Sequence, residues 1–241
     1  MSSMPDDEQR RDFMRRSLTL IPAVSLGSGV TLTASAAEEP PALADYPPSF
    51  FNTDEWQFIL AACDQLIPSD EHGPGALETN VPIFIDKELY GPFGHAERWY
   101  MQEPFITDGD PELGYQLPYT PRELYRHGIA AVERYCQQEH AEAFSALDAA
   151  TRDDILGRLE QDKIDFAALD AAPLTAGVFF SFLWQNTREG YFADPIYGGN
   201  KHMGAWKMIG FTGARANFRE WVEQHNVPYP LGPVSLSGER G

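Results

Sequence analysis

Apolar side chains recur at intervals of three and four residues through most of the chain beyond residue 50, and this spacing restricts the fold more than any other feature. The first such segment opens at Thr53 and stops before Pro68, with acidic residues in its first turn. Its apolar positions are Trp56, Ile59, Leu60, Cys63, Leu66 and Ile67. Strand-like alternation is hard to find, and no internal repeat of fixed period occurs. The spacing therefore predicts a mainly α fold, organised as a single compact helical domain with long ordered loops.

Start and stop signals divide this helical part. The clearest is the capping box Thr120-Pro121-Arg122-Glu123, which begins a long helix with proline at its first position. Residues 174–191 are apolar nearly all round, which is typical of a central helix. The other predicted helices cover residues 83–90, 141–148 and 151–161, and residues 91–120 form a long loop rich in glycine, proline and aromatic residues.

The N-terminal residues 1–36 have the layout of an export signal. A basic run precedes an uncharged stretch that ends in small residues, and Arg10, Arg11 and Phe13 resemble the core of the twin-arginine signal, which exports folded proteins. Ala34 and Ala36 match the small-x-small cleavage pattern. The sequence therefore predicts a periplasmic protein that meets the twin-arginine translocase, with a retained, uncleaved anchor helix as the alternative.

The charge of the chain lies outside this signal. The 36 acidic and 18 basic residues give a net charge of -18, and the signal holds four of each. Such an acidic surface repels phosphate backbones, so we expect no nucleic-acid partner. Around the helical domain at residues 51–227 we expect a proline-rich linker at 37–50 and an extended tail at 228–241.

Two cysteines, Cys63 and Cys136, fall on the apolar faces of predicted helices, outside any metal-binding spacing. In an oxidising compartment they fit either a disulfide between two packed helices or two buried free thiols. The chain also lacks a phosphate-binding loop, a zinc-protease motif, a nucleophile elbow and a dinucleotide fingerprint. Its six histidines are scattered, so the sequence offers no catalytic, cofactor-binding or metal-binding residue of its own.

One segment, residues 194–215, packs five glycines among large aromatic residues. Its backbone must turn sharply and approach other groups closely. Two interpretations stand side by side. Either the segment is an ordered cap on the central helix, with Asp194 and Asn200 bonding local amides, or it is a docking surface with Tyr197, Trp206 and Phe211 as aromatic anchors.

The run Asp-Pro-Ile-Tyr-Gly-Gly-Asn-Lys-x-Met-x-x-Trp-Lys-x-Ile-Gly-Phe-x-Gly-Ala-Arg in residues 194–215 resembles the hallmark of the gluconate 2-dehydrogenase subunit 3 family. The resemblance extends to the export signal, to the opening helix from Phe51 to Pro68 and to the tail from Tyr229 to Pro233. On the docking interpretation, the partner interface consists of Asp194, Tyr197, Gly198, Gly199, Asn200, Trp206, Phe211 and Arg215.

This resemblance implies a small accessory subunit of a membrane-associated, three-subunit sugar or sugar-acid dehydrogenase that acts on CH-OH groups. In such complexes a large FAD-dependent subunit of the glucose-methanol-choline type oxidises the substrate. A multihaem cytochrome c subunit passes the electrons to quinone. The small subunit has no cofactor of its own, supports folding of the flavin subunit and carries it across the membrane. Substrate choice belongs to the flavin subunit.

Two other functions remain open at this point. One is an independent periplasmic enzyme whose acid-base groups lie in residues 91–120 and 194–215, with Asp194 and His202 as the candidate pair. The other is a transient export chaperone that leaves the flavin subunit after translocation.

Overall fold

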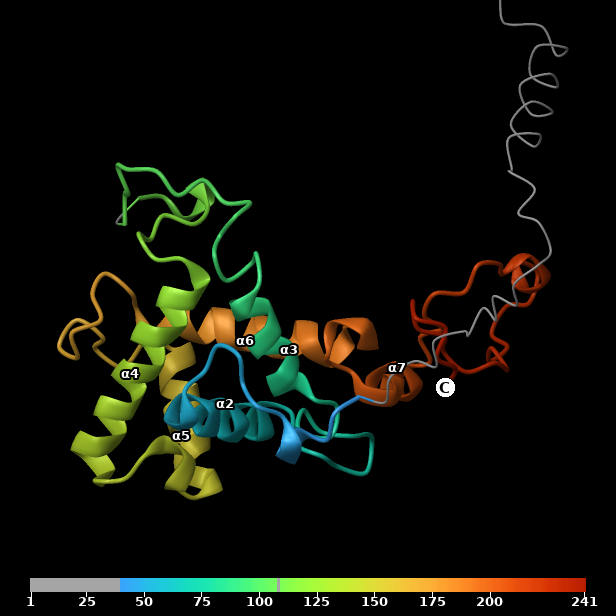
Figure 1. Cartoon of the computed structure of the whole chain (residues 1–241), viewed down its shortest axis with the longest axis horizontal. Coiled ribbons are helices and arrows are strands. Elements are labelled where there is room, and N and C mark those ends of the chain that lie inside the picture. The colour runs from blue at the N-terminus through green and yellow to red at the C-terminus, as the bar shows by residue number, and fades with distance from the viewer. Residues whose placement is uncertain (1–39, 108) are drawn as a thin grey trace, which may run out of the picture. The chain divides into compact units, whose positions relative to one another are not determined.

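The structure is a computed structural model that describes residues 40–107 and 109–241. These residues belong to one compact unit of six α-helices and several short 3-10 turns, and the described part contains isolated β-bridges but no β-strand. The mainly α prediction is thus confirmed. The helices are α2 (Thr53–Leu66), α3 (Val81–Tyr90), α4 (Pro121–His140), α5 (Ala149–Glu160), α6 (Ala176–Phe192) and α7 (Gly204–Ile209) (Figure 1).

The predictions for the N-terminal residues fall outside this description. The export-signal residues Arg10, Arg11 and Phe13 and the cleavage residues Ala34 and Ala36 lie outside the described residues. Within them, no helix is both long enough and apolar enough to cross a membrane.

Helix α6 is the element around which the others pack. It contacts α2, α3, α4, α5 and α7 (Figure 1). The fully buried ring of Phe179 on α6 lies 5.9 Å from the ring of Tyr125 on α4 and 6.2 Å from that of Phe58 on α2. Gly128 on α4 packs directly against Phe179, where a methyl group would collide with the ring. The prediction of a central helix near residues 174–191 is confirmed.

Side-chain caps set the helix starts. Thr120 and Glu123 form the predicted capping box of α4, and Asn52 forms a second one with Glu55 at α2, one residue before the predicted start. Asp148 accepts the backbone N–H of Thr151 at 3.0 Å, so α5 begins at residue 149 and not at 151.

The predicted helix over residues 141–148 is wrong. Helix α4 ends at His140, because its C-cap Ala141 has a left-handed φ of 59° that stops the helix. Glu133 then accepts the backbone N–H of Phe144 at 3.1 Å, and the Phe144 ring packs 4.9 Å from that of Phe58. These contacts turn the chain back onto α2, so only the 3-10 turn Phe144–Ala146 forms.

Part of the segment predicted as a linker is packed onto the body. The carboxylate of Asp86 on α3 is fully buried and accepts hydrogen bonds from the Tyr46 hydroxyl and from the backbone N–H groups of Ser49, Phe50 and Phe51, at 2.8–3.1 Å. Burial, together with the bond to Asp86, raises the pKa of Tyr46 well above its usual value. One carboxylate therefore holds residues 46–51, the strap that leads into α2, in place against α3.

The predicted long loop also has a packed part. Between α3 and α4, the rings of Trp99 and Tyr115 lie 5.0 Å apart, and both pack against Phe182 on α6. The helical part ends at Ile209, because residues 210–241 contain only the 3-10 turn Arg219–Trp221. Within the predicted helical domain over 51–227, the α-helices thus occupy residues 53–209.

Candidate functional site

The signature segment, residues 194–215, starts where α6 ends. Asp194 is 8% exposed, and its carboxylate accepts two backbone N–H groups, from Ile196 at 3.1 Å and from Leu236 at 2.8 Å. The first bond caps the 3-10 turn Pro195–Tyr197, and the second ties the C-terminal part of the chain to that turn. Asp194 therefore organises the segment from within.

Asn200 is the second internal organiser. It is fully buried with a φ of 45°, a left-handed conformation that asparagine adopts more readily than most residues. Its side-chain amide donates to the backbone oxygen of Ala193 at 2.9 Å and accepts the backbone N–H of Ala205 at 2.9 Å. These two bonds join the end of α6 to the first turn of α7.

The two residues before Asn200 are glycines at positions where a side chain does not fit. Gly198 has a φ of 101°, which side chains disfavour, and it lies beneath the side chain of Lys87 on α3. Gly199 lies against the backbone of Gly190 on α6, where a methyl group would collide with the carbonyl oxygen. The glycine pair thus lets the segment run directly over α3 and α6.

Trp206, one of the three aromatic anchors of the docking interpretation, is buried inside the segment. It is 6% exposed, and its indole N–H donates to the backbone oxygen of Phe192 at 2.8 Å. The ring of Phe211 meets it edge to face at 5.0 Å, and Gly213 packs on its other edge. Trp206 therefore holds α7 against the end of α6.

The C-terminal residues are also tied to the signature. Val234 forms a parallel bridge with Gly213, and its carbonyl oxygen accepts the N–H of Ala214 at 2.7 Å. The guanidinium of Arg215 lies 5.6 Å from the ring centre of Tyr229. Residues 228–241, which the sequence predicted as an extended tail, therefore contact the signature at Gly213, Ala214 and Arg215.

The outer face of this unit is apolar. Tyr197 is 52% exposed, and Ile196 and Leu236 are 57% and 64% exposed. Phe211 also faces solvent, whereas Asp194, Gly199, Asn200 and Trp206 are buried, and Gly198 and Arg215 are half-buried. The eight predicted interface residues thus divide into a buried scaffold and a smaller exposed set. The buried set corresponds to the cap interpretation, and the docking interpretation stays a prediction.

Sequence reasoning missed Lys87 and Leu236 as members of this face. Lys87 lies more than 100 residues before the signature, and Leu236 lies beyond its end. The contact of Lys87 with Gly198 and the bond from Leu236 to Asp194 arise only from the fold. Ile196, in contrast, belongs to the quoted motif and could have been identified by its position beside Tyr197.

The structure gives no support to an acid-base pair of Asp194 and His202. Both carboxylate oxygens of Asp194 accept backbone N–H groups, so the side chain is committed to local structure. His202 faces Glu239, with 3.4 Å between Nδ1 and Oε1. Each group of the predicted pair thus has another partner.

Cys63 and Cys136 are both free thiols and both buried, which corresponds to the second of the two expectations for them. Cys63 Sγ lies 3.9 Å from the Thr187 hydroxyl on α6. Burial raises the pKa of each thiol to about 12. Within residues 40–107 and 109–241, no group of three or more His, Cys, Asp or Glu side chains is placed to hold a metal ion.

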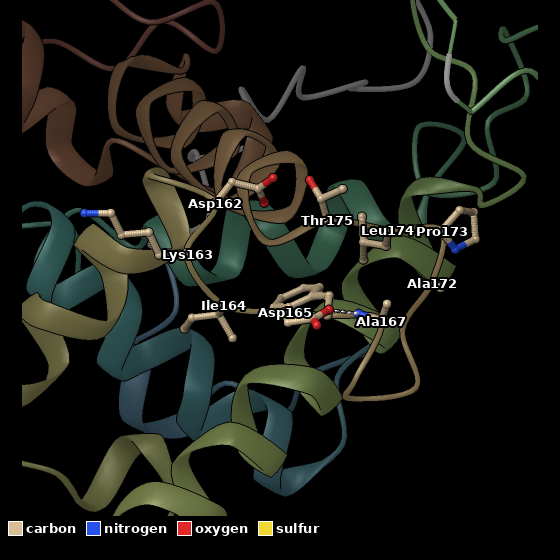
Figure 2. A pocket seen from close by; sticks show the side chains of 10 residues that line it. Asp162, Lys163, Ile164, Asp165, Ala167, Ala172, Pro173, Leu174 and Thr175 are labelled. Atoms are coloured by element: carbon tan, nitrogen blue, oxygen red, sulfur yellow. Dashed lines mark hydrogen bonds between the residues drawn. The ribbon is translucent and has the colours of Figure 1, made fainter.

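A cavity of about 350 Å³ lies in the loop between α5 and α6 (Figure 2). Its acidic side chains accept hydrogen bonds from backbone N–H groups. Asp165 accepts the N–H groups of Ala167 and Ala168, and Asp162 accepts that of Gly177 at 2.7 Å. Lys163 points away from the other labelled side chains (Figure 2). This cavity lacks the convergent polar groups of a small-molecule site.

Comparison with known proteins bears on the signature directly. Curated proteins and solved structures gave no match. The family model described as gluconate 2-dehydrogenase subunit 3 matches residues 53–213, from the first residue of α2 to the glycine that bridges to Val234. The match covers two thirds of the chain, so the chain belongs to the gluconate 2-dehydrogenase subunit 3 family.

Proposed function

We propose that this chain is the non-catalytic small subunit of a membrane-associated, FAD-dependent dehydrogenase complex of the gluconate 2-dehydrogenase type. The observation that carries the proposal is the family match over residues 53–213, which includes nearly all of the signature segment. The subunit binds a large flavin subunit of the glucose-methanol-choline type. A multihaem cytochrome c subunit completes the complex, and FAD and haem c reside in those partners.

The geometry of the signature supports a docking role. Tyr197 and Ile196 expose more than half of their surface, although large apolar residues usually gain by burial. The turn that carries them is held by the carboxylate of Asp194 and by the glycine contacts with α3 and α6. A surface held in one conformation loses little entropy when it binds, so these side chains are suited to a permanent interface.

The second part of the proposal concerns export. The Arg10-Arg11 pair directs the chain to the twin-arginine translocase, and the flavin subunit crosses the membrane into the periplasm as its folded passenger. The strap that Asp86 fixes would join the signal to a body that is already folded.

Purification of the complex tests the first part. A tag is placed after Gly241 on a flexible linker, the protein is isolated from its native host in mild detergent, and co-purifying chains are identified together with the visible spectrum. We expect a stoichiometric flavoprotein with flavin and haem absorption bands. A lone, colourless protein would contradict a permanent subunit and favour the transient chaperone.

Replacement of both arginines tests the second part. In the Arg10→Lys, Arg11→Lys variant, the flavin subunit should remain in the cytoplasm. Dehydrogenase activity is measured in periplasmic and cytoplasmic fractions, with total flavin subunit as the reference. Full periplasmic activity in the double variant would show that the flavin subunit does not depend on this chain for export.

A further inference from the structure

Charge is distributed unevenly along the chain. Residues 37–193 contain 28 acidic and nine basic side chains, a net charge of -19, whereas residues 194–241 contain four acidic and five basic ones, a net charge of +1. Lys201 and Lys207 belong to this second part, and Lys87 touches it through Gly198. Three of the four lysines of the chain thus lie in, or touch, the C-terminal part, whose net charge is not negative.

Lys87 is the lysine whose position the signature determines. It lies in the last turn of α3, it is exposed, and its stem runs over Gly198. A methyl group on residue 198 would lie 3.1 Å from both Cδ and Nζ of Lys87, which is tighter than ordinary contacts. Among the described residues, no carboxylate lies within 4 Å of the ammonium group.

We group four exposed residues around this contact as the Tyr197 face: Lys87, Ile196, Tyr197 and Leu236. Tyr197 directly precedes the glycine under Lys87. Ile196 and Leu236 are neighbours because their backbone N–H groups bind the two oxygens of one carboxylate. The face therefore has an apolar area with Lys87 beside it, a cation that forms no ion pair with any carboxylate in the part of the chain that the structure describes.

We propose that the Tyr197 face binds a protein partner through apolar contacts of Ile196 and Tyr197 and through an ion pair from Lys87 to an aspartate or glutamate of that partner. This inference rests on the proposed function, in which the partner is the flavin subunit. An apolar centre with a charged rim is the usual composition of a protein interface. Residues 37–193 carry a net charge of -19, so most of their surface repels a carboxylate, and the charge pattern favours one orientation of docking.

A protein partner fits this face better than a membrane does. Each lysine near an anionic leaflet contributes only about 1 kcal/mol, and stable membrane binding requires several such residues or a lipid anchor. The Tyr197 face offers one lysine on a chain of net charge -18. A single cation at the rim of an apolar contact is enough to orient a protein partner and to speed its association.

Charge reversal with a matched control tests the inference. Lys87→Glu and Lys163→Glu each change the net charge by the same amount at an exposed lysine, but Lys163 lies in the loop between α5 and α6 (Figure 2). Each tagged variant is purified as above, and the retained flavin subunit is quantified per mole of small subunit at low and high salt. We expect about a tenfold loss for Lys87→Glu at low salt and no change for Lys163→Glu.

Lys87→Gln removes the charge without adding an acid to the C-terminal turn of α3, where a negative charge disfavours the helix. Lys87→Gln should retain more flavin subunit than Lys87→Glu but less than the wild type. Lys87→Arg should retain as much as the wild type. Thermal unfolding of each isolated variant shows whether the fold is retained. If the flavin subunit is lost only from variants whose unfolding temperature is lowered, the proposed ion pair is wrong.

The outcomes separate this inference from the proposed function. If the wild type retains the flavin subunit and Lys87→Glu retains as much, the Lys87 pair is wrong and the subunit assignment stands. If the wild type retains no partner, both fail. Flotation with phosphatidylglycerol vesicles completes the test, because binding that Lys87→Glu abolishes would assign the face to a membrane instead of a protein.

Discussion

The carboxylate of Asp194 accepts the backbone N–H of Leu236 at 2.8 Å, which joins two residues 42 positions apart. Its other oxygen accepts the N–H of Ile196, so one buried side chain holds the first turn of the signature and the C-terminal residues together. The exposed side chains of Ile196 and Leu236 are neighbours because of this bond. The apolar face of the signature thus depends on a polar group beneath it.

Replacement of Asp194 by asparagine should release the C-terminal residues. The amide keeps one acceptor oxygen but presents an NH₂ group to the other N–H, which is left unpaired at a cost of about 1–3 kcal/mol. Amide hydrogen exchange at Leu236 should accelerate by at least tenfold, while amides in α4 keep their protection. Unchanged exchange at Leu236 would show that other contacts suffice to hold residues 228–241.

Asp86 should be the more costly carboxylate to change. It is fully buried and serves four donors, so Asp86→Asn leaves about two of them without an acceptor and should lower the free energy of unfolding by about 2–4 kcal/mol. Urea denaturation gives the free energy, and amide hydrogen exchange at Phe50 and Phe51 gives local release, because both N–H groups bind Asp86. Asp153→Asn on the exposed side of α5 is the control, with an expected change within about 0.5 kcal/mol.

Glu133 should make stability fall as the pH rises. Burial raises its pKa above the ordinary 4.5, opposed by the hydrogen bond from Phe144 and assisted by the charge of Asp54. The folded state therefore binds the proton more tightly than the unfolded state does. The resulting stabilisation is complete below pH 4.5 and is lost as the pH rises through the higher pKa of the folded state.

Glu133→Gln removes this titration, so the variant should gain stability relative to the wild type between pH 4.5 and pH 7. Urea denaturation at several pH values measures the difference, and Glu139→Gln, exposed on the same helix, is the matched control. A constant difference between wild type and Glu133→Gln across that range would mean that the Glu133 pKa is the same in both states.

The two thiols should be inert in the native protein. Burial raises the pKa of Cys63 and of Cys136 to about 12, so almost no thiolate exists at pH 7. Ellman's reagent should detect fewer than about 0.1 thiols per chain in native buffer. In urea without reductant, both cysteines should react. Absence of reactive thiol in urea would instead show that the mature protein carries the disulfide.

Most helices could be predicted from the sequence because their signals are local. The capping box of Thr120 and Glu123 and the apolar stripe of α4 need only a few residues to be recognised. The prediction of a helix at 141–148 was wrong because the conformation of this segment depends on contacts with Glu133 and Phe58, which lie outside it. A short apolar stretch without its own cap follows its tertiary contacts.

The signature shows the same limit at the level of the site. Its glycines correctly indicated sharp turns and close contacts, but the sequence does not say which side chains face inward. Trp206 satisfies its indole N–H on Phe192 and is buried, whereas Tyr197 in the same motif is exposed. Lys87 joins the face through an approach of α3 to Gly198 that no spacing along the chain encodes.

The contact of Gly199 with α6 should be the least tolerant point of the signature. An alanine methyl group there would collide with the backbone oxygen of Gly190, and a backbone atom in a packed helix cannot move aside as a flexible side chain can. Gly199→Ala should therefore cost about 3 kcal/mol or more in the free energy of unfolding. The same change at Gly157, inside α5 with open space around it, should stabilise the protein by about 0.5–1 kcal/mol because alanine favours a helix. Thermal and urea unfolding of the two variants measure both effects. Equal stabilities would mean that the signature can lift away from α6 without loss, and that its position there does not depend on the glycine.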